Sequence, residues 1–100
     1  MTALRFTISG FEPDYGVHPG ETLKELLREA GWSQAELARR TGLSQKHISR
    51  VITGNAGIGA DMALLLERET NVSARMWASM QAAYDVYAAR VQQRHPTSFS

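Results

Sequence analysis

The sequence predicts an all-α domain of five helices, and three observations support this fold class. Apolar residues recur at i, i+3 and i+4 spacing in successive segments from His18 onwards. Ser33, Ser44 and Ser73 each precede such a segment, where a serine hydroxyl can cap the unpaired backbone N–H groups of a helix start. Glycines close the earlier segments. Because 100 residues suffice for one modest core, we expect a single domain over residues 18–92.

Residues 1–17 are predicted to be an extension of this domain, and residues 93–100 a flexible tail. Leu4, Phe6 and Ile8 alternate with polar residues before the run stops at a glycine, which predicts a short strand. The rest of the sequence offers no second strand to pair with it. The extension is therefore expected to add at most a single strand to the all-α fold.

The first predicted helix follows a connector rich in turn-forming residues. Leu23, Leu26 and Leu27 lie on one of its faces, so the helix is amphipathic. Gly31 follows its last apolar turn, where a glycine can adopt the left-handed backbone that ends a helix.

Two short helices are predicted in the segment SQAELARRTGLSQKHISRVITGN, residues 33–55. Ser33 and Glu36 have the spacing of a capping box, in which the serine accepts from the backbone and the glutamate reaches back to the cap. Gly42 allows the chain to reverse, and Ser44 offers the next cap. The spacing predicts two helices joined by a tight turn, the second of which runs to Gly54.

The second of these helices is predicted to have an apolar inner face and a polar outer face. Ile48, Val51 and Ile52 repeat at helical spacing on the inner face. Glutamine can pair with adenine through two hydrogen bonds, and lysine or arginine can approach N7 and O6 of guanine in the major groove. The outer face therefore predicts contact with double-stranded DNA through Gln45, Lys46, Ser49 and Arg50.

Positive charge is concentrated in the same segment. The whole chain has a formal net charge of +1. Residues 33–55 contain four basic side chains, and Glu36 is the one acidic side chain among them. A basic face on a nearly neutral molecule indicates local phosphate contacts rather than general binding of polyanions.

Two further helices are predicted after this segment. The fourth spans Ala60–Thr70, with Met62, Leu65 and Leu66 as its apolar face. The fifth begins after Ser73, runs to about Gln92, and is apolar on two sides. One of the two sides is expected to complete the core, either that with Met76, Met80, Ala83, Tyr84, Tyr87 and Val91 or that with Ala78, Ala82, Val86 and Ala89. The helical spacing of Trp77 and Tyr84 predicts that both pack in the core. An exposed apolar helix face usually marks a partner surface, so we predict a homodimer with the interface Met80, Ala82, Tyr84, Val86, Tyr87 and Ala89.

The order of residues in the two short helices resembles the lambda-repressor-like (XRE) helix-turn-helix superfamily. The matching letters are S-Q-A-E-L-A, then G-L-S-Q, and then I-S-x-[VI]-x-x-G. The resemblance implies that Gln34, at the start of the first helix, and Gln45 with Lys46, at the head of the second, approach an operator.

The flanking residues narrow this resemblance to the HigA-type antitoxins. H-P-G-E from His18, A-D-x-A-L-x-L from Ala60 and W-x-x-x-Q-x-x-Y-D from Trp77 are typical of that group. The resemblance covers residues 18–87 and implies a DNA-binding protein that neutralises a small RNA-cleaving toxin of the HigB class and represses its own operon. Gly59 departs from the pattern, because many relatives have a threonine cap there, and the extension is absent from many relatives.

The predicted contacts follow from these two lines of argument. Bases are expected to be read by Gln45, Lys46 and Arg50, and phosphates to be contacted by Gln34, Arg39, Ser44 and Asn55. Further possible DNA contacts are His47, Ser49 and Thr53. The toxin is expected to bind the extension, since a lone strand can pair with the edge of a partner's sheet, through Leu4, Phe6, Ile8 and Phe11.

Two alternatives stay open at this point. The first is a stand-alone XRE-family or phage-like transcriptional regulator that has no toxin partner. The second is a protein-interaction module whose helix-turn-helix no longer binds DNA, although the basic side chains of the second short helix speak against it.

Other classes of function find no support in the sequence. The chain has no cysteine, which excludes disulfides and thiolate zinc sites, and its histidines are far apart with no acidic partner at ligand spacing. G-x-S-x-G, P-loop and H-E-x-x-H motifs are absent. No apolar run is long enough to span a bilayer, and the start lacks a signal pattern. We expect a cytoplasmic protein of bacterial or phage origin that is no enzyme and needs neither metal nor cofactor.

Overall fold

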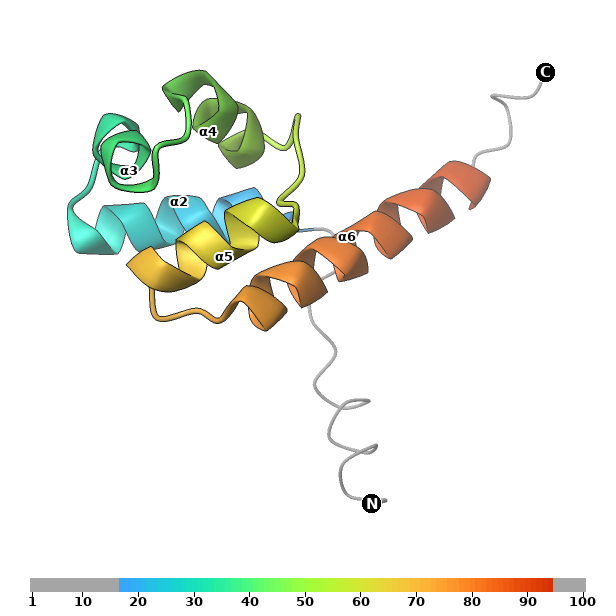
Figure 1. Ribbon diagram of the computed structural model, residues 1–100. Coiled ribbons are helices and arrows are strands. Elements are labelled where there is room, and N and C mark those ends of the chain that lie inside the picture. The colour runs from blue at the N-terminus through green and yellow to red at the C-terminus, as the bar shows by residue number, and fades with distance from the viewer. Residues whose placement is uncertain (1–16, 95–100) are drawn as a thin grey trace, which may run out of the picture.

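The computed structural model describes residues 17–94, and they form five α-helices (Figure 1). The helices are α2 (Pro19–Ala30), α3 (Gln34–Thr41), α4 (Gln45–Ile52), α5 (Ala60–Glu69) and α6 (Ala74–Arg94). The all-α prediction is confirmed. The predicted strand lies outside the described residues. Among the described helices, none is both long enough and apolar enough to cross a membrane.

Serine caps begin three of the helices, as predicted. The Oγ atoms of Ser33, Ser44 and Ser73 accept hydrogen bonds from backbone N–H groups three residues later, at 3.0, 3.0 and 3.1 Å. These bonds satisfy donors that an isolated helix start leaves unpaired. Helix α5 begins at Gly59 without a side-chain cap, which confirms the weaker cap expected there.

The capping box predicted for α3 is formed by only one of its two partners. Ser33 accepts from the backbone of Glu36, but the Glu36 carboxylate does not reach back to the cap. It binds the guanidinium groups of Arg39 and Arg40 instead. An ion pair with two guanidinium groups is stronger than one hydrogen bond to a neutral N–H, so the carboxylate turns toward the arginines.

Left-handed glycines end α2 and α3 where the sequence predicts them. Gly31 has φ 74° and Gly42 has φ 81°. Helix α4 ends earlier than predicted, at Ile52, because Thr53 takes the C-cap position and Gly54 turns the chain with φ 86°. A side chain at these angles would strain the backbone, so glycine lets the chain reverse within a few residues.

The core lies where α2, α3, α4, α5 and the first half of α6 meet. Leu23, Leu37, Ile48, Leu66 and Trp77 are fully buried in it. The apolar face of α5 is confirmed for Met62 and Leu66. Leu65 is only half-buried, however, and Ala63 is buried in its place. The small alanine side chain faces inward because α5 packs between α3 and α6.

Helix α6 packs on the core with part of the first of its two apolar sides, since Met80, Ala83 and Tyr84 are half-buried. Trp77 is fully buried, which confirms its predicted place in the core, whereas Met76 is 52% exposed. The residues that follow Trp77 on its face are Gln81 and Tyr84, and the Oε1 atom of Gln81 accepts from the backbone N–H of Ile58 at 2.8 Å. Burying the large indole sets the rotation of the helix, because aromatic side chains bury the most apolar area.

The second half of α6 extends away from the other helices (Figure 1). Residues 85–90 are all exposed, so neither side of this half packs on the rest of the chain. The prediction that one stripe completes the core along the whole helix therefore holds only for its first half.

The start of α2 joins three elements. The Nδ1 atom of His18 accepts from the backbone N–H of Gly20 at 3.1 Å, so the His18 side chain is the N-cap of α2. Its ring also meets the Tyr84 ring edge-on at a centroid distance of 5.8 Å. Gly20 lies directly against the backbone of Val51, and Gly54 lies against the His18 ring. The junction therefore fixes α2 against α4 and α6.

Candidate nucleic-acid interface

Helices α3 and α4 lie together at one side of the fold, joined by the short turn after Gly42 (Figure 1). The inner face of α4 is anchored in the core by Ile48 and Val51, both buried. Its opposite face is open to solvent, and Gln45 and Lys46 are exposed on its first turn. The fold thus presents the first turn of α4 outward, with its polar side chains available to a ligand.

Arg50 lies at the other end of α4. Its side chain is exposed, and its Nη2 atom donates to the backbone carbonyl of Asn55 at 3.3 Å. The guanidinium group is thus directed at the loop between α4 and α5. Of the three residues predicted to read bases, two share the first turn of the helix, and the third lies beside this loop.

Several residues predicted to touch DNA also complete the ends of the helices. Ser44 caps α4 through its Oγ atom. The Thr53 hydroxyl lies 3.1 Å from the carbonyl of Ser49, and Thr53 Oγ1 accepts from the Asn55 side-chain amide at 3.1 Å. His47 and Ser49 are half-buried. These polar groups therefore fix the shape of α4 and its loop.

Gln34 occupies the first position of α3 and is half-buried. It lies immediately after the Ser33 cap, so its backbone belongs to the first turn of the helix. Backbone N–H groups at a helix start carry partial positive charge, which suits contact with a phosphate.

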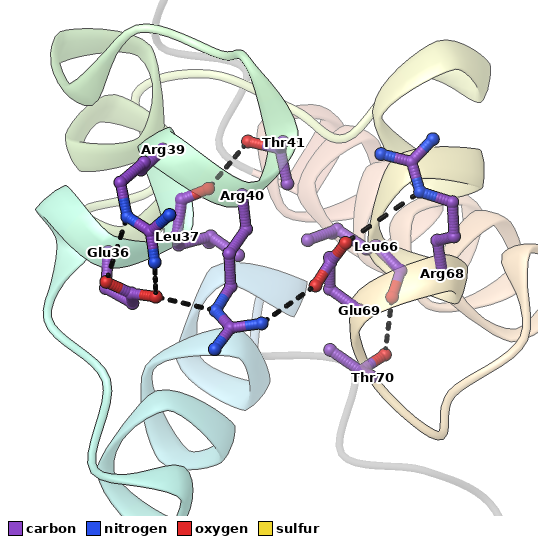
Figure 2. A network of polar contacts seen from close by, with 9 residues as sticks. All are labelled: Glu36, Leu37, Arg39, Arg40, Thr41, Leu66, Arg68, Glu69 and Thr70. Carbon is purple, nitrogen blue, oxygen red and sulfur yellow. Dashed lines mark hydrogen bonds and ion pairs between the residues drawn. The ribbon is translucent and has the colours of Figure 1, made fainter.

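A network of charged side chains connects α3 to α5 (Figure 2). The Glu36 carboxylate accepts from Arg39 and Arg40, and the Arg40 Nε–Oε2 distance is 2.8 Å. Arg40 Nη1 also lies 3.6 Å from Glu69 Oε1. The Arg40 guanidinium stacks over the Trp32 ring at 4.0 Å. Arg40 is therefore held from three sides, whereas Arg39 pairs with Glu36 and is otherwise turned to solvent.

The local part of this network was visible in the sequence, since Glu36, Arg39 and Arg40 have i,i+3 and i,i+4 spacing. The contacts of Arg40 with Trp32 and Glu69 were missed. No periodicity connects these positions, because Glu69 belongs to a helix that meets α3 only in the folded chain.

The arginines hold the pKa of Glu36 below its ordinary value. The hydrogen bond from Arg39 is the main cause, desolvation opposes it, and the charge of Arg39 and the contacts of Arg40 add to the lowering. Glu36 is therefore ionised at neutral pH.

Some residues of the predicted dimer surface are partly buried within the chain, and the others are exposed. Met80 and Tyr84 are half-buried against the rest of the chain, while Ala82, Val86, Tyr87 and Ala89 are exposed. The residues predicted to bind the toxin, Leu4, Phe6, Ile8 and Phe11, lie outside the described residues. Within residues 17–94, no cluster of three or more His, Asp or Glu side chains could hold a metal ion.

Comparison with known sequences identifies relatives that match most of the chain. A family model described as "Helix-turn-helix" matches residues 23–77. Virulence-associated protein I of Dichelobacter nodosus is 39% identical over 74 residues, which are 73% of this chain and 68% of that protein. The uncharacterised HTH-type transcriptional regulator YddM of Escherichia coli K12 is 32% identical over 71 residues, 71% of this chain and 76% of that protein.

Solved structures agree with these sequence matches. The antitoxin HigA of Pseudomonas aeruginosa with the higBA promoter has a TM-score of 0.71 and 36% identity, covering 82% of this chain and 94% of that one. Another Pseudomonas aeruginosa protein, in complex with its 18-base-pair operator DNA, has a TM-score of 0.70 and 38% identity, covering 73% and 80%. A HigA-family antidote protein of Coxiella burnetii has a TM-score of 0.70 and 27% identity, covering 83% and 92%.

Proposed function

The chain belongs to the helix-turn-helix family as a HigA-like protein of the XRE type, and from this premise we propose that it represses transcription as the antitoxin of a HigBA-type module. The observation that carries the DNA-binding part is the position of Gln45 and Lys46. They are exposed on the first turn of a helix whose other face is anchored in the core. In helix-turn-helix proteins, this part of the second helix enters the major groove.

The proposed contacts divide into those that position the protein and those that specify sequence. Gln45, Lys46 and Arg50 read base edges, and for Arg50 this requires that a base replace the carbonyl of Asn55 as its hydrogen-bond partner. Phosphates are contacted by Arg39 and by the cap regions of α3 and α4, with Gln34, Ser44 and Asn55. His47, Ser49 and Thr53 form the edge of this surface.

Loss of a base-reading side chain is expected to weaken binding at one position of the operator. Lys46→Ala or Arg50→Ala should cost roughly 1 to 3 kcal/mol at the operator and relax the base preference there. The operator is obtained by selection from a random duplex pool, and affinity is measured by fluorescence anisotropy on single-base variants.

Arg75→Ala is the matched control for this experiment, since Arg75 is an exposed cation on the first turn of α6, outside the motif. It should bind all duplexes like the unchanged protein. Equal affinities and base preferences for the Lys46 and Arg50 variants and the unchanged protein would show that these residues do not read bases.

The toxin partner is proposed from the likeness to HigA antitoxins. Its predicted contact remains the segment with Leu4, Phe6, Ile8 and Phe11. Deleting Met1–Gly10 should impair neutralisation of a HigB-class toxin in a co-expression growth assay, while operator binding by the isolated protein stays nearly unchanged. Full neutralisation by the shortened protein would place the contact elsewhere.

A second candidate function is a transcriptional regulator without a toxin, which the 32% identity to the regulator YddM favours. The two functions share the DNA-binding surface and differ in the neighbouring gene. An adjacent open reading frame for a small RNA-cleaving protein that co-purifies with this chain would support the antitoxin. If no such gene or complex is found, the regulator becomes the better assignment.

A further inference from the structure

Glu36 pairs with Arg39, the more exposed of the two arginines on α3. It is the one acidic residue of residues 33–55, and it lies among the predicted phosphate contacts. Arg39 donates to both of its carboxylate oxygens, with an Nε–Oε1 distance of 3.3 Å. The Arg39 side chain is nevertheless 70% exposed, against 28% for Glu36. A phosphate that approaches α3 therefore meets a guanidinium whose donors are already directed at a carboxylate.

Arg40 would remain paired with the Glu36 carboxylate if Arg39 turned away from it. Its Nε donates to Glu36 Oε2 at 2.8 Å, and its other contacts, the Trp32 ring and Glu69, keep it in place. Figure 2 shows Arg40 between Glu36 and Glu69, so Glu36 retains this partner when Arg39 turns outward. The exchange replaces the two charge-assisted hydrogen bonds from Arg39 to the carboxylate by charge-assisted hydrogen bonds to a phosphate, so its free-energy change is small.

We infer that Glu36 is an internal competitor for DNA phosphate: it binds Arg39 in the free protein and releases it to the DNA backbone. The inference rests on the proposed function and adds a control on its phosphate affinity. Glu36 is a positioning residue in this scheme, because it acts through Arg39 and does not itself bind DNA.

The competitor lowers affinity for every duplex, since phosphates carry no sequence information. The binding of one helix-turn-helix domain to DNA phosphates is thereby kept weak. Tight binding then depends on base contacts and on two such domains that bind DNA together. Arg40 differs in this from Arg39, which is released to a phosphate. It stabilises Glu36 in the bound state and does not contact phosphate.

The test compares Glu36→Gln with the unchanged protein on the selected operator and on a random duplex. Affinity should rise roughly two- to fivefold on both, the range expected when an exposed ion pair no longer competes. The slope of log affinity against log salt should steepen by up to about 1, because the interface gains one net positive charge. Glutamine has nearly the helix propensity of glutamate, and the ion pairs that the variant loses are partly exposed, so the melting temperature should fall only modestly.

Three further variants isolate the mechanism. Glu25→Gln removes a carboxylate that binds Arg28 at 2.8 Å with the same i,i+3 spacing on α2, and it should leave DNA affinity unchanged. Glu36→Asp retains the charge and should retain the salt slope of the unchanged protein. In an Arg39→Ala background, Glu36→Gln should no longer raise affinity.

Each alternative outcome overturns the inference in a distinct way. If Glu25→Gln raised DNA affinity as much as Glu36→Gln does, the net charge of the protein and not the release of Arg39 would explain the gain. A gain that persists in the Arg39→Ala background would mean that Glu36 repels DNA directly. If the unchanged protein binds the operator but Glu36→Gln binds no better, the competitor does not exist, while the proposed function stands. If the unchanged protein binds no duplex, the proposed function and the inference both fail.

Discussion

Gly20→Ala is expected to destabilise the fold by about 2 to 4 kcal/mol, because α2 and α4 touch through their backbones at this position. A Cβ atom on Gly20 would lie 2.0 Å from the carbonyl oxygen of Val51 and 2.9 Å from Cε1 of His18. The Val51 oxygen belongs to the main chain of α4 and cannot rotate away as a side chain could. Accommodating the methyl group requires α4 to move off α2, which separates buried side chains of the core.

The displacement also affects the proposed DNA surface, since α4 carries Gln45 and Lys46. We therefore expect operator affinity to fall together with stability. Chemical denaturation followed by tryptophan fluorescence measures the free energy of unfolding, and Trp77 reports on the core because it is fully buried there.

Gly59→Ala is the matched control, because a Cβ at this position meets nothing within 4 Å. Gly59 is the N-cap of α5 with φ −83°, which any residue adopts. Its substitution should cost no more than about 1 kcal/mol, the difference between glycine and alanine at a cap. An unchanged free energy of unfolding for Gly20→Ala would show that α2 and α4 pack less closely than this geometry requires.

Val86→Glu is expected to convert the proposed homodimer into monomers. Operator affinity should then fall by roughly a hundredfold or more, the usual contribution of linking two binding domains. Val86 is 50% exposed and Tyr87 36% exposed on the half of α6 that extends away from the core. Tyr87 also lies beside Tyr84, with a centroid distance of 6.3 Å, so the apolar surface continues toward the body of the protein.

We propose that α6 of a second copy of the chain covers this surface. The two helix-turn-helix domains of the dimer would then bind half-sites roughly 34 to 36 Å apart. A carboxylate at position 86 would have to lose its water at such an interface, which is unfavourable without a partner charge. Affinity for a single half-site should be nearly unchanged, since α4 is not altered.

Sedimentation and operator titration check this expectation, with Gln92→Glu as the control. Gln92 is exposed and lies seven residues after Asp85, on a side of α6 that already carries a charge and contains none of the predicted interface residues. It should remain dimeric. A Val86→Glu protein that stays dimeric and binds the operator normally would remove the second half of α6 from the interface, and the extension would be the next candidate.

The sequence by itself determined the features that depend on one or two turns of chain. Ser33, Ser44 and Ser73 cap helices because an N-cap bond spans three residues. Gly31 and Gly42 reverse the chain because only glycine adopts a left-handed backbone without strain. The apolar spacing of Ile48 and Val51 likewise decided which face of α4 is buried and which is exposed to solvent.

Where a side chain or a helix face had two possible partners that the local sequence did not distinguish, the tertiary structure decided which of them it contacts. The Glu36 carboxylate could bind either the backbone at the cap or the two nearby arginines, and in the fold it binds the arginines. Arg40 is held in place for this contact by the Trp32 ring and by Glu69 of α5. Two stripes of α6 were both apolar, and burial of Trp77 selected one while leaving Met76 in solvent. The close approach of Gly20 to Val51 has no signal in the sequence either. Contacts between helices depend on their relative rotation and distance, which the summed packing of the whole core sets, so no local pattern of residues contains them.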